Sequence, residues 1–245
     1  MSAKEQVLNL NVGAIVVATG FEIPDPKDKA LLGYEKYDRV ITGLDLENML
    51  FEKGLGSLDG LRDIAFIQCF GSRDEQRGRG YCSRVCCKYA LRLAGLIKFR
   101  YPDARITVYN MDIQLGGKGF AEVYDKVAGE VEFVSGIPTR VYGLEDGVEV
   151  RVEDFGQGKV VRRRHDLVVL SVGMAPNKDN PKLARVLGTN LGKYGFLGTV
   201  DEMEPLLTNR EGVVLAGSCQ GPKDITESMA HGIQAASRVA EWLPT

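Results

Sequence analysis

The sequence predicts an α/β fold, in which buried strands alternate with helices around a parallel sheet. Short continuous apolar runs, each ended by small residues, are typical of strands that are covered on both faces. Between these runs lie segments with apolar residues at helical spacing. The 245 residues are 44% hydrophobic and 26% charged, as in ordinary globular proteins. A chain of this length can bury a core for one large domain or two small ones.

The first half of the chain alternates between strand and helix patterns. An apolar run at 12–18 predicts a strand, and Thr19-Gly20 ends it. A proline-rich loop follows, then a helix over 44–53 with Thr42 or Gly43 near its cap, and a glycine-rich hinge. The next expected elements are a strand over 63–69, a helix over 82–100 that Pro102 ends, a strand over 105–112, a helix over 120–127 and a short strand over 131–134.

In the second half of the chain, the spacing of the apolar residues changes from a helical pattern to simple alternation. From Pro138 the apolar residues alternate with polar ones, which predicts a three-stranded meander over 139–144, 148–155 and 159–164. A buried strand over 166–172 follows. The last expected elements are a strand over 212–217 and a closing helix over 225–243.

This order of elements indicates two domains, one inserted into the other. Strand, helix, strand, helix and strand, then a meander and a final buried strand, is the layout of a small dinucleotide-binding domain, here spanning 61–173. The flanking segments, 1–60 and 174–245, are expected to form the second domain. The similar strand ends at 16–20 and 169–173 indicate the two crossovers between the domains.

Four of the five cysteines form one compact motif, C-x12-C-x3-C-C, made by Cys69, Cys82, Cys86 and Cys87. Cys69 ends a predicted strand, where a nucleotide-binding domain has its glycine-rich turn, and no G-x-G-x-x-G follows. Cys82 and Cys86 are expected one turn apart on a helix. The spacing favours an iron–sulfur cluster over the paired C-x2-C motifs of structural zinc. Zinc binding and ordinary or redox-active thiols remain alternatives.

Positively charged residues lie between and beside these four cysteines. They are Arg73, Arg77, Arg79, Arg84 and Lys88, against only two acidic residues, Asp74 and Glu75. Positive charge around four thiolates would offset the negative charge of a cluster and raise its reduction potential.

Composition excludes several classes of function. A net charge of −2 gives no indication of nucleic acid or of an anionic membrane as a partner. The longest apolar runs are too short to span a bilayer, and the first residues lack the apolar region of a secretion signal. Unpaired thiols fit a reducing cytoplasm. Cys219, His165 and His231 have no companion ligands at a useful spacing and are expected to be structural.

Several motifs carry a family resemblance. VVATGFE at 16–22, VLSVGMAPN at 169–177 and VVLAGSCQGPKDITES at 213–228 resemble the crossover and flavin-closing motifs of thioredoxin-reductase-like flavoproteins. The cysteine window, with YCSRVCC and the later VYNMDI, is similar to the A subunit of heterodisulfide reductases. The resemblance implies a three-layer fold with two dinucleotide-binding domains, of which the flavin domain is incomplete. It also implies that Cys69, Cys82, Cys86 and Cys87 hold one [4Fe-4S] cluster.

The resemblance further implies contacts to FAD. Ser218 occupies a position where relatives carry an acidic residue, and Arg92 one where family members can present a lysine. The N-terminus of the helix after Asp224 would offer backbone donors to the flavin. The implied FAD-binding residues are Thr19, Gly20, Arg92, Gly217, Ser218, Lys223, Asp224, Ile225 and Thr226.

The function implied is that of an electron-transfer module, relaying electrons between the cluster and FAD, with flavin-based electron bifurcation in the full complex. Implied partners are other heterodisulfide-reductase-like subunits and an electron-donor subunit of hydrogenase or dehydrogenase type, with a homodimer as a further option. The family's N-terminal flavin fingerprint is missing, so we expect a piece of a larger subunit or one product of a split gene, inactive alone. The alternatives are a zinc-binding scaffold and an NAD(P)H-dependent disulfide reductase using Cys86.

Overall fold

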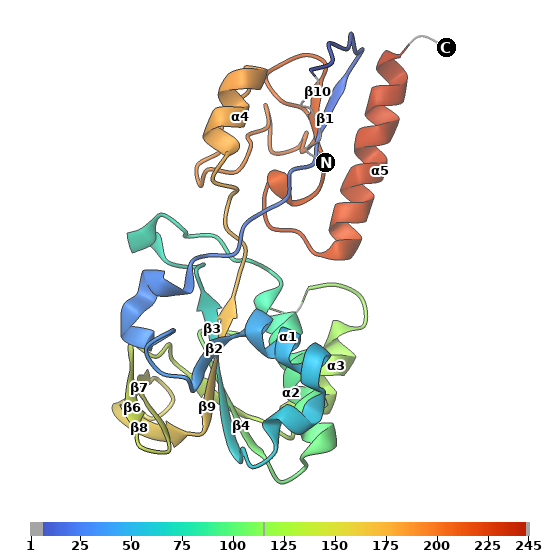
Figure 1. Ribbon diagram of the computed structural model, residues 1–245. Helices are drawn as coiled ribbons and strands as arrows, with labels where there is room; N and C mark the ends of the chain where they lie inside the picture. The colour runs from blue at the N-terminus through green and yellow to red at the C-terminus, as the bar shows by residue number, and fades with distance from the viewer. Residues whose placement is uncertain (1–6, 115, 244–245) are drawn as a thin grey trace, which may run out of the picture. The chain divides into compact units, whose positions relative to one another are not determined.

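The computed structural model describes residues 7–114 and 116–243 and divides the chain into two compact units (Figure 1). The inserted unit is the continuous segment Glu22–Ala175. The split unit consists of the residues up to Phe21 and those from Pro176 onward. Both units combine parallel strands with helices, so the predicted α/β class is confirmed.

The inserted unit is built on a five-stranded parallel sheet with the order β2-β9-β3-β4-β5. The chain runs from the central strand β3 outward through β4 to β5, and β9 returns on the other side of β3. The carboxyl ends of β3 and β9 therefore flank the point where the strand order reverses, which is where open α/β sheets bind ligands. The strands are β2 (Val40–Thr42), β3 (Asp63–Phe70), β4 (Arg105–Asn110), β5 (Glu132–Ser135) and β9 (Leu167–Val172).

Helices cover one face of this sheet and a meander covers the other, giving the three layers that were expected (Figure 1). The helices are α1 (Gly43–Lys53), α2 (Cys86–Arg100) and α3 (Phe120–Ala128), with short 3-10 turns at Pro26–Leu32, Leu55–Leu58 and Glu75–Arg77. The meander is β6 (Arg140–Leu144), β7 (Gly147–Asp154) and β8 (Lys159–His165). Every residue of β3 and β9 is buried, which explains their continuous apolar runs.

A buried polar chain joins the strands at the amino end of the sheet. His165 Nδ1 lies 2.5 Å from Asp63 Oδ1, and His165 Nε2 lies 2.8 Å from the hydroxyl of Tyr109. Asp63 also accepts from Arg105 Nε at 2.6 Å. His165 is structural, as expected, but its acidic partner lies 102 residues away in the sequence and spacing gave no sign of it.

The split unit contains a two-stranded parallel sheet, β1 (Ile15–Val17) with β10 (Val213–Leu215). The two strands share one sheet, as the interrupted arrangement requires. Its other elements are α4 (Asn180–Leu187), a 3-10 turn at Gly217–Cys219 and α5 (Ile225–Trp242). The Cys219 thiol is fully buried and donates to the carbonyl of Val17 at 3.1 Å, in keeping with a packed structural residue.

The split unit leaves much apolar surface exposed. On α5, Ile225, Met229 and Ile233 are each more than 60% exposed, and in β1 Ile15 and Val16 are exposed too. The opposite face of α5 packs Ala235 and Val239 against β10. A helix that is apolar on both faces is normally covered on both.

Two expectations need correction. The inserted unit begins at Glu22 and not at 61, because β2 pairs with β9 and α1 covers the same sheet. The three residues of β2 are too few for a clear strand pattern, and both β2 and α4 were missed. Helix α2 begins at Cys86, so Cys82 precedes the helix instead of lying on it. The outer ends of the predicted second domain, 1–6 and 244–245, lie outside the described residues.

Among the described residues, no helix combines the length and apolar character needed to cross a membrane.

Candidate functional site

The cysteine site begins with an irregularity at the end of β3. The register with β9 runs regularly to Ile67–Leu170 and then shifts before Phe70–Val172. Ile67 and Phe70 both pack toward the meander, although residues three apart in a regular strand point to opposite faces. Cys69 lies between them with a φ of 59°, in the left-handed region. The break lets the Cys69 thiol reach the helix side of the sheet, where it hydrogen-bonds with Cys86.

Three thiols form a continuous hydrogen-bonded group. Cys86 is the first residue of α2, and its thiol hydrogen-bonds with those of Cys69 and Cys87. Cys82 lies in the preceding loop, half-buried, and interacts electrostatically with Cys69 and Cys87. Its sulfur accepts from the backbone N–H of Arg84 at 3.3 Å. Cys82 thus lies near the other three thiols, and it belongs to the loop instead of the helix.

The loop that carries Cys82 is fixed to the end of β9. The Tyr81 hydroxyl donates to the carbonyl of Met174 at 2.8 Å, and the Met174 N–H donates to Ser83 Oγ at 2.9 Å. A Cβ on Gly173 would lie 1.9 Å from Ser83 Oγ, so only glycine allows this approach. The glycine in the second crossover motif is therefore a packing requirement of the cysteine loop.

Backbone strain concentrates in this loop. Within the described ranges, four residues other than glycine have positive φ, and three of them are Cys69, Arg73 and Arg84, at 59°, 53° and 63°. Such conformations persist where the surrounding structure enforces them, and they cluster at functional sites.

Fewer arginines contact the cysteines than the sequence indicated. Arg73 hydrogen-bonds with Asp112 and with Cys69, and both interactions raise the pKa of its guanidinium. Arg77 and Arg79 lie against carboxylates instead, Arg77 at 3.4 Å from Asp74 and Arg79 at 2.8 Å from Asp28. Of these three arginines, Arg73 alone is directly engaged with a cysteine, because the loop turns the other two toward the acidic side chains.

The thiols titrate as a linked group. The hydrogen bond from Cys86 lowers the pKa of Cys87 to about 7, against the opposing effect of burial. Cys86 itself has a pKa well above the usual value, because its hydrogen bonds to Cys69 and Cys87 and its burial favour the protonated form. The pKa of Cys69 is lowered, again chiefly by Cys86. A lowered pKa makes a thiolate available to a metal near neutral pH, and the N-terminus of α2 also favours negative charge there.

The donor set fits an iron–sulfur cluster. Four thiols on an irregular loop match the ligand number of a [4Fe-4S] group, in which each iron takes one cysteine. In the part of the chain that the structure describes, no group of three or more His, Cys, Asp or Glu residues is arranged around a single metal ion. Buried polar atoms of Gln68, Ser72 and Ser171, all at this end of the sheet, have no hydrogen-bond partner. Buried polar groups normally have one, and a bound group could supply it.

The residues implied for flavin lie mainly at one end of the split unit. Thr19-Gly20 follows β1 and Gly217-Ser218 follows β10, and the register of the two parallel strands brings these turns to the same edge. Gly217 has a φ of 70°, and its N–H donates to His231 Nδ1 at 2.9 Å.

The start of α5 continues this edge of the split unit. Asp224 caps the helix by accepting from the N–H of Glu227 at 2.8 Å. Ile225 and Thr226 are the first two residues of α5, so their N–H groups have no partner within the helix. Lys223 contacts Gln220 in the connecting loop. The arrangement resembles an anion-accepting helix terminus next to a glycine turn.

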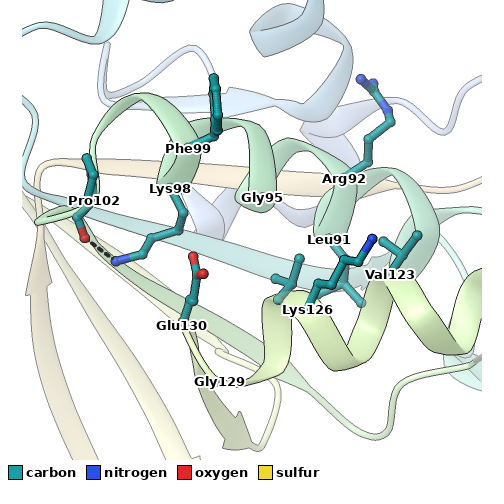
Figure 2. A pocket seen from close by; sticks show the side chains of 11 residues that line it. Leu91, Arg92, Gly95, Lys98, Phe99, Pro102, Val123, Lys126, Gly129 and Glu130 are labelled. Atoms are coloured by element: carbon teal, nitrogen blue, oxygen red, sulfur yellow. Dashed lines mark hydrogen bonds between the residues drawn. The ribbon is translucent and has the colours of Figure 1, made fainter.

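Arg92 is separate from this group. It lies on α2 in the inserted unit, pairs with Glu47 of α1 and lines an open hollow of about 800 Å³ between α2 and α3 (Figure 2). Phe99 and Lys126 line the same hollow. Arg92 thus belongs to the inserted unit, and the other eight residues belong to the split unit.

No family model matches the sequence. Several proteins are nonetheless similar over nearly all of this chain. The A subunit of the H2:CoB-CoM heterodisulfide,ferredoxin reductase of Methanothermobacter marburgensis is 42% identical over 245 residues, which cover 95% of this chain and 37% of the relative. An iron-sulfur A subunit of the CoB–CoM heterodisulfide reductase of Methanopyrus kandleri is 40% identical over 253 residues, covering 97% and 38%. The chain thus spans less than two fifths of these relatives.

Solved structures share the fold. Thioredoxin reductase from T. acidophilum matches with a TM-score of 0.59 and 17% identity over 93% of this chain and 65% of its own. The Lactococcus lactis thioredoxin reductase matches with a TM-score of 0.59 and 18% identity, over 94% of this chain and 65% of its own. At this identity the likeness concerns the fold, and the thioredoxin-reductase-like architecture that the motifs indicated is confirmed.

Proposed function

Because this chain is homologous over nearly all of its length to the A subunits of heterodisulfide reductases, we propose that it is an electron-transfer module of such an oxidoreductase. In this proposal Cys69, Cys82, Cys86 and Cys87 hold one [4Fe-4S] cluster, and electrons pass between the cluster and FAD. The observation that carries the proposal is the convergence of the four cysteines at the reversal point of the sheet, beside the N-terminus of α2. The name of the Methanopyrus relative, which includes the words "iron-sulfur", supports it.

The chain's own residues would prepare the site for one-electron chemistry, which the cluster supplies when bound. Cys69 and Cys87 have lowered pKa values and offer thiolates, while Cys86 releases its proton on binding a metal. Arg73 holds a positive charge against Cys69. Tyr81, Ser83 and Gly173 fix the loop, so that little rearrangement accompanies electron transfer.

The FAD site is proposed at the carboxyl ends of β1 and β10, with Thr19, Gly20, Gly217 and Ser218 in the turns and Lys223, Asp224, Ile225 and Thr226 at the start of α5. These residues would address the ribityl chain and the polar edge of the ring. The G-x-G-x-x-G turn that normally anchors the pyrophosphate is not in this sequence. The exposed apolar surface of β1 and α5 supports completion of the site by a further polypeptide segment, in the same or another chain.

The names of the relatives also support a place for this chain in a larger complex. The name of the Methanothermobacter relative includes both a heterodisulfide and ferredoxin. We accordingly place this chain in a complex with other heterodisulfide-reductase-like subunits and an electron-donor subunit of hydrogenase or dehydrogenase type, where flavin-based electron bifurcation would take place.

The deciding test is the metal content of the chain purified without oxygen. We expect about four irons and four sulfides per chain, with the broad visible absorbance of a cluster that bleaches on reduction. Stoichiometric zinc without iron would overturn the proposal and favour a scaffold role. Metal-free protein that reduces a disulfide with NAD(P)H would favour the reductase alternative.

A further inference from the structure

Two buried polar side chains behind the cysteines lack partners. Gln68 is completely buried, and neither its amide nitrogen nor its amide oxygen makes a hydrogen bond. Ser171 is equally buried, and its hydroxyl meets only that of Tyr89, without the geometry of a full hydrogen bond. Native proteins rarely leave a buried side-chain amide with both atoms unsatisfied, so each such case calls for a specific explanation.

Both side chains lie on the helix-covered face of the sheet. Along β3, Ile64 and Phe66 belong to the core under the helices, and Gln68 follows two residues later on the same face. Along β9, Val169 belongs to that core and Ser171 follows in the same way. The register shift sets Ser171 opposite the pair Gln68-Cys69, so the two unsatisfied groups are neighbours at the end of the sheet.

The surroundings of this polar spot leave few acceptors. Toward the amino end of the strands stand Phe66 and Val169, which are apolar. On the helix side, Tyr89 is three residues after Cys86 and already donates its hydroxyl to the carbonyl of Val172 at 2.8 Å. The residue that follows Gln68 is Cys69, whose thiol hydrogen-bonds with Cys86. Sulfur is therefore the prominent acceptor at this end of the sheet.

We propose that Gln68 is a positioning residue of the metal centre, which donates its amide N–H to a sulfur of the group that the four cysteines hold, with Ser171 supporting it. The inference rests on the proposed function. A donor to sulfur stabilises the more negative, reduced state and so raises the reduction potential. It also orients the ligands, in the way that outer-shell hydrogen bonds hold metal ligands elsewhere.

The test is Gln68→Met in the anaerobically purified full chain, since Met fills a similar volume and removes both polar atoms. We expect unchanged iron and sulfide content, a more negative midpoint potential, altered g-values in the electron paramagnetic resonance spectrum of the reduced protein, and roughly tenfold faster loss of iron to a chelator. Ser171→Ala should change the same quantities in the same direction by less. The matched control is Thr189→Val, which removes another unpartnered buried hydroxyl in the split unit and should leave the potential unchanged.

The outcomes separate the two proposals. Absence of iron from the wild-type chain would refute the cluster itself, whatever Gln68 does. An iron-replete Gln68→Met variant with the wild-type potential and spectrum would overturn the role of Gln68, and a lowered melting temperature alone would indicate that Gln68 and Ser171 only pack together. Should Gln68→Met fail to fold, Gln68→Asn decides in its place, because the shorter amide keeps its polarity but draws back from the sulfur. A wild-type potential in Gln68→Asn would then count against the proposal.

Discussion

The two units end their strands in similar turns and differ in what surrounds them. In the inserted unit the sheet is covered on both faces, β3 and β9 are buried throughout, and the cysteine loop is fixed by Tyr81 and Ser83. In the split unit the sheet has two strands, and β1 and α5 expose apolar side chains. In our proposal the inserted unit therefore supplies all four cluster ligands, and the split unit supplies one side of the flavin site.

This difference separates the two cofactor proposals. Metal binding depends on four thiols of the inserted unit and on the strand irregularity that turns Cys69 toward Cys86. Flavin binding depends on turns that offer donors without the glycine fingerprint that would hold the pyrophosphate. The metal centre should therefore assemble in this chain alone, while flavin should need a further segment.

The largest effect is expected from removing a cysteine of the inserted unit. Cys86→Ala deletes the thiol that links Cys69 and Cys87, so the variant should lose essentially all cluster iron and the associated visible absorbance. Iron analysis and the visible spectrum under anaerobic conditions measure this. The matched control is Cys219→Ala, another buried cysteine, which lies in the split unit and should keep full iron. Equal loss of iron in both variants would contradict the assignment of the ligands.

The next largest effect concerns FAD. The chain alone should bind FAD weakly, because the absence of even two charge-assisted hydrogen bonds at about 1.5 kcal/mol each lowers affinity by about two orders of magnitude. Titration with FAD, followed by flavin fluorescence quenching, tests this. Addition of a polypeptide that carries a G-x-G-x-x-G flavin turn should tighten binding by at least that factor. Submicromolar affinity of the chain by itself would mean that the flavin site is complete here.

The same contrast explains how far the sequence could be interpreted. The long buried strands β3 and β9 are recognisable by continuous apolar runs, and the meander by alternating apolar and polar residues. The sheet and its layers were therefore predictable. The three residues of β2 are too few to show an alternating pattern, and they form a strand because they pair with β9. Because of this pairing, the inserted unit begins at residue 22 and not at residue 61.

The candidate site was predictable in composition and less so in geometry. Residue type and spacing selected the four cysteines, but the position of Cys82 depends on where α2 begins, which the positive φ of Arg84 and the anchoring of Ser83 decide. Gln68 gave no signal, because an unsatisfied buried amide is a property of the folded state. Arg92 pairs with Glu47 in the structure, and its role toward FAD stays a prediction.

A moderate effect is expected at the amino end of the inserted sheet. Burial by itself raises the pKa of Asp63, but His165 and Arg105 outweigh it, so the net pKa is lowered below 3.8. Asp63→Ala leaves His165 and Arg105 without their acceptor and should destabilise the inserted unit by about 3 kcal/mol at neutral pH. Because the folded pKa is lowered, this contribution is present above about pH 4 and disappears as the pH falls through the folded pKa.

Urea unfolding of the wild type and the variant measures this difference. The control is Asp146→Ala, which removes a carboxylate paired with Arg164 on the exposed surface and should change stability much less. A variant as stable as the wild type at neutral pH would show that the buried chain of Asp63, His165 and Tyr109 contributes little.

The smallest effect concerns the pH at which the two units lose stability. In the split unit, burial and the charge of Lys223 lower the pKa of His231 below 6.5, although the carbonyl of Pro205, which accepts from the ring, opposes this. Below about pH 6.5 the unfolded chain gains a proton on this residue more readily than the folded one, so the split unit should weaken there. The inserted unit should keep its stability until about pH 4.

Hydrogen exchange, corrected for intrinsic rates, should therefore show lost protection in β10 and α5 before any in β3. His231→Gln keeps an acceptor for the Gly217 N–H and a donor for the Pro205 carbonyl, and should abolish that early loss. Equal early loss in the variant would remove His231 as the cause.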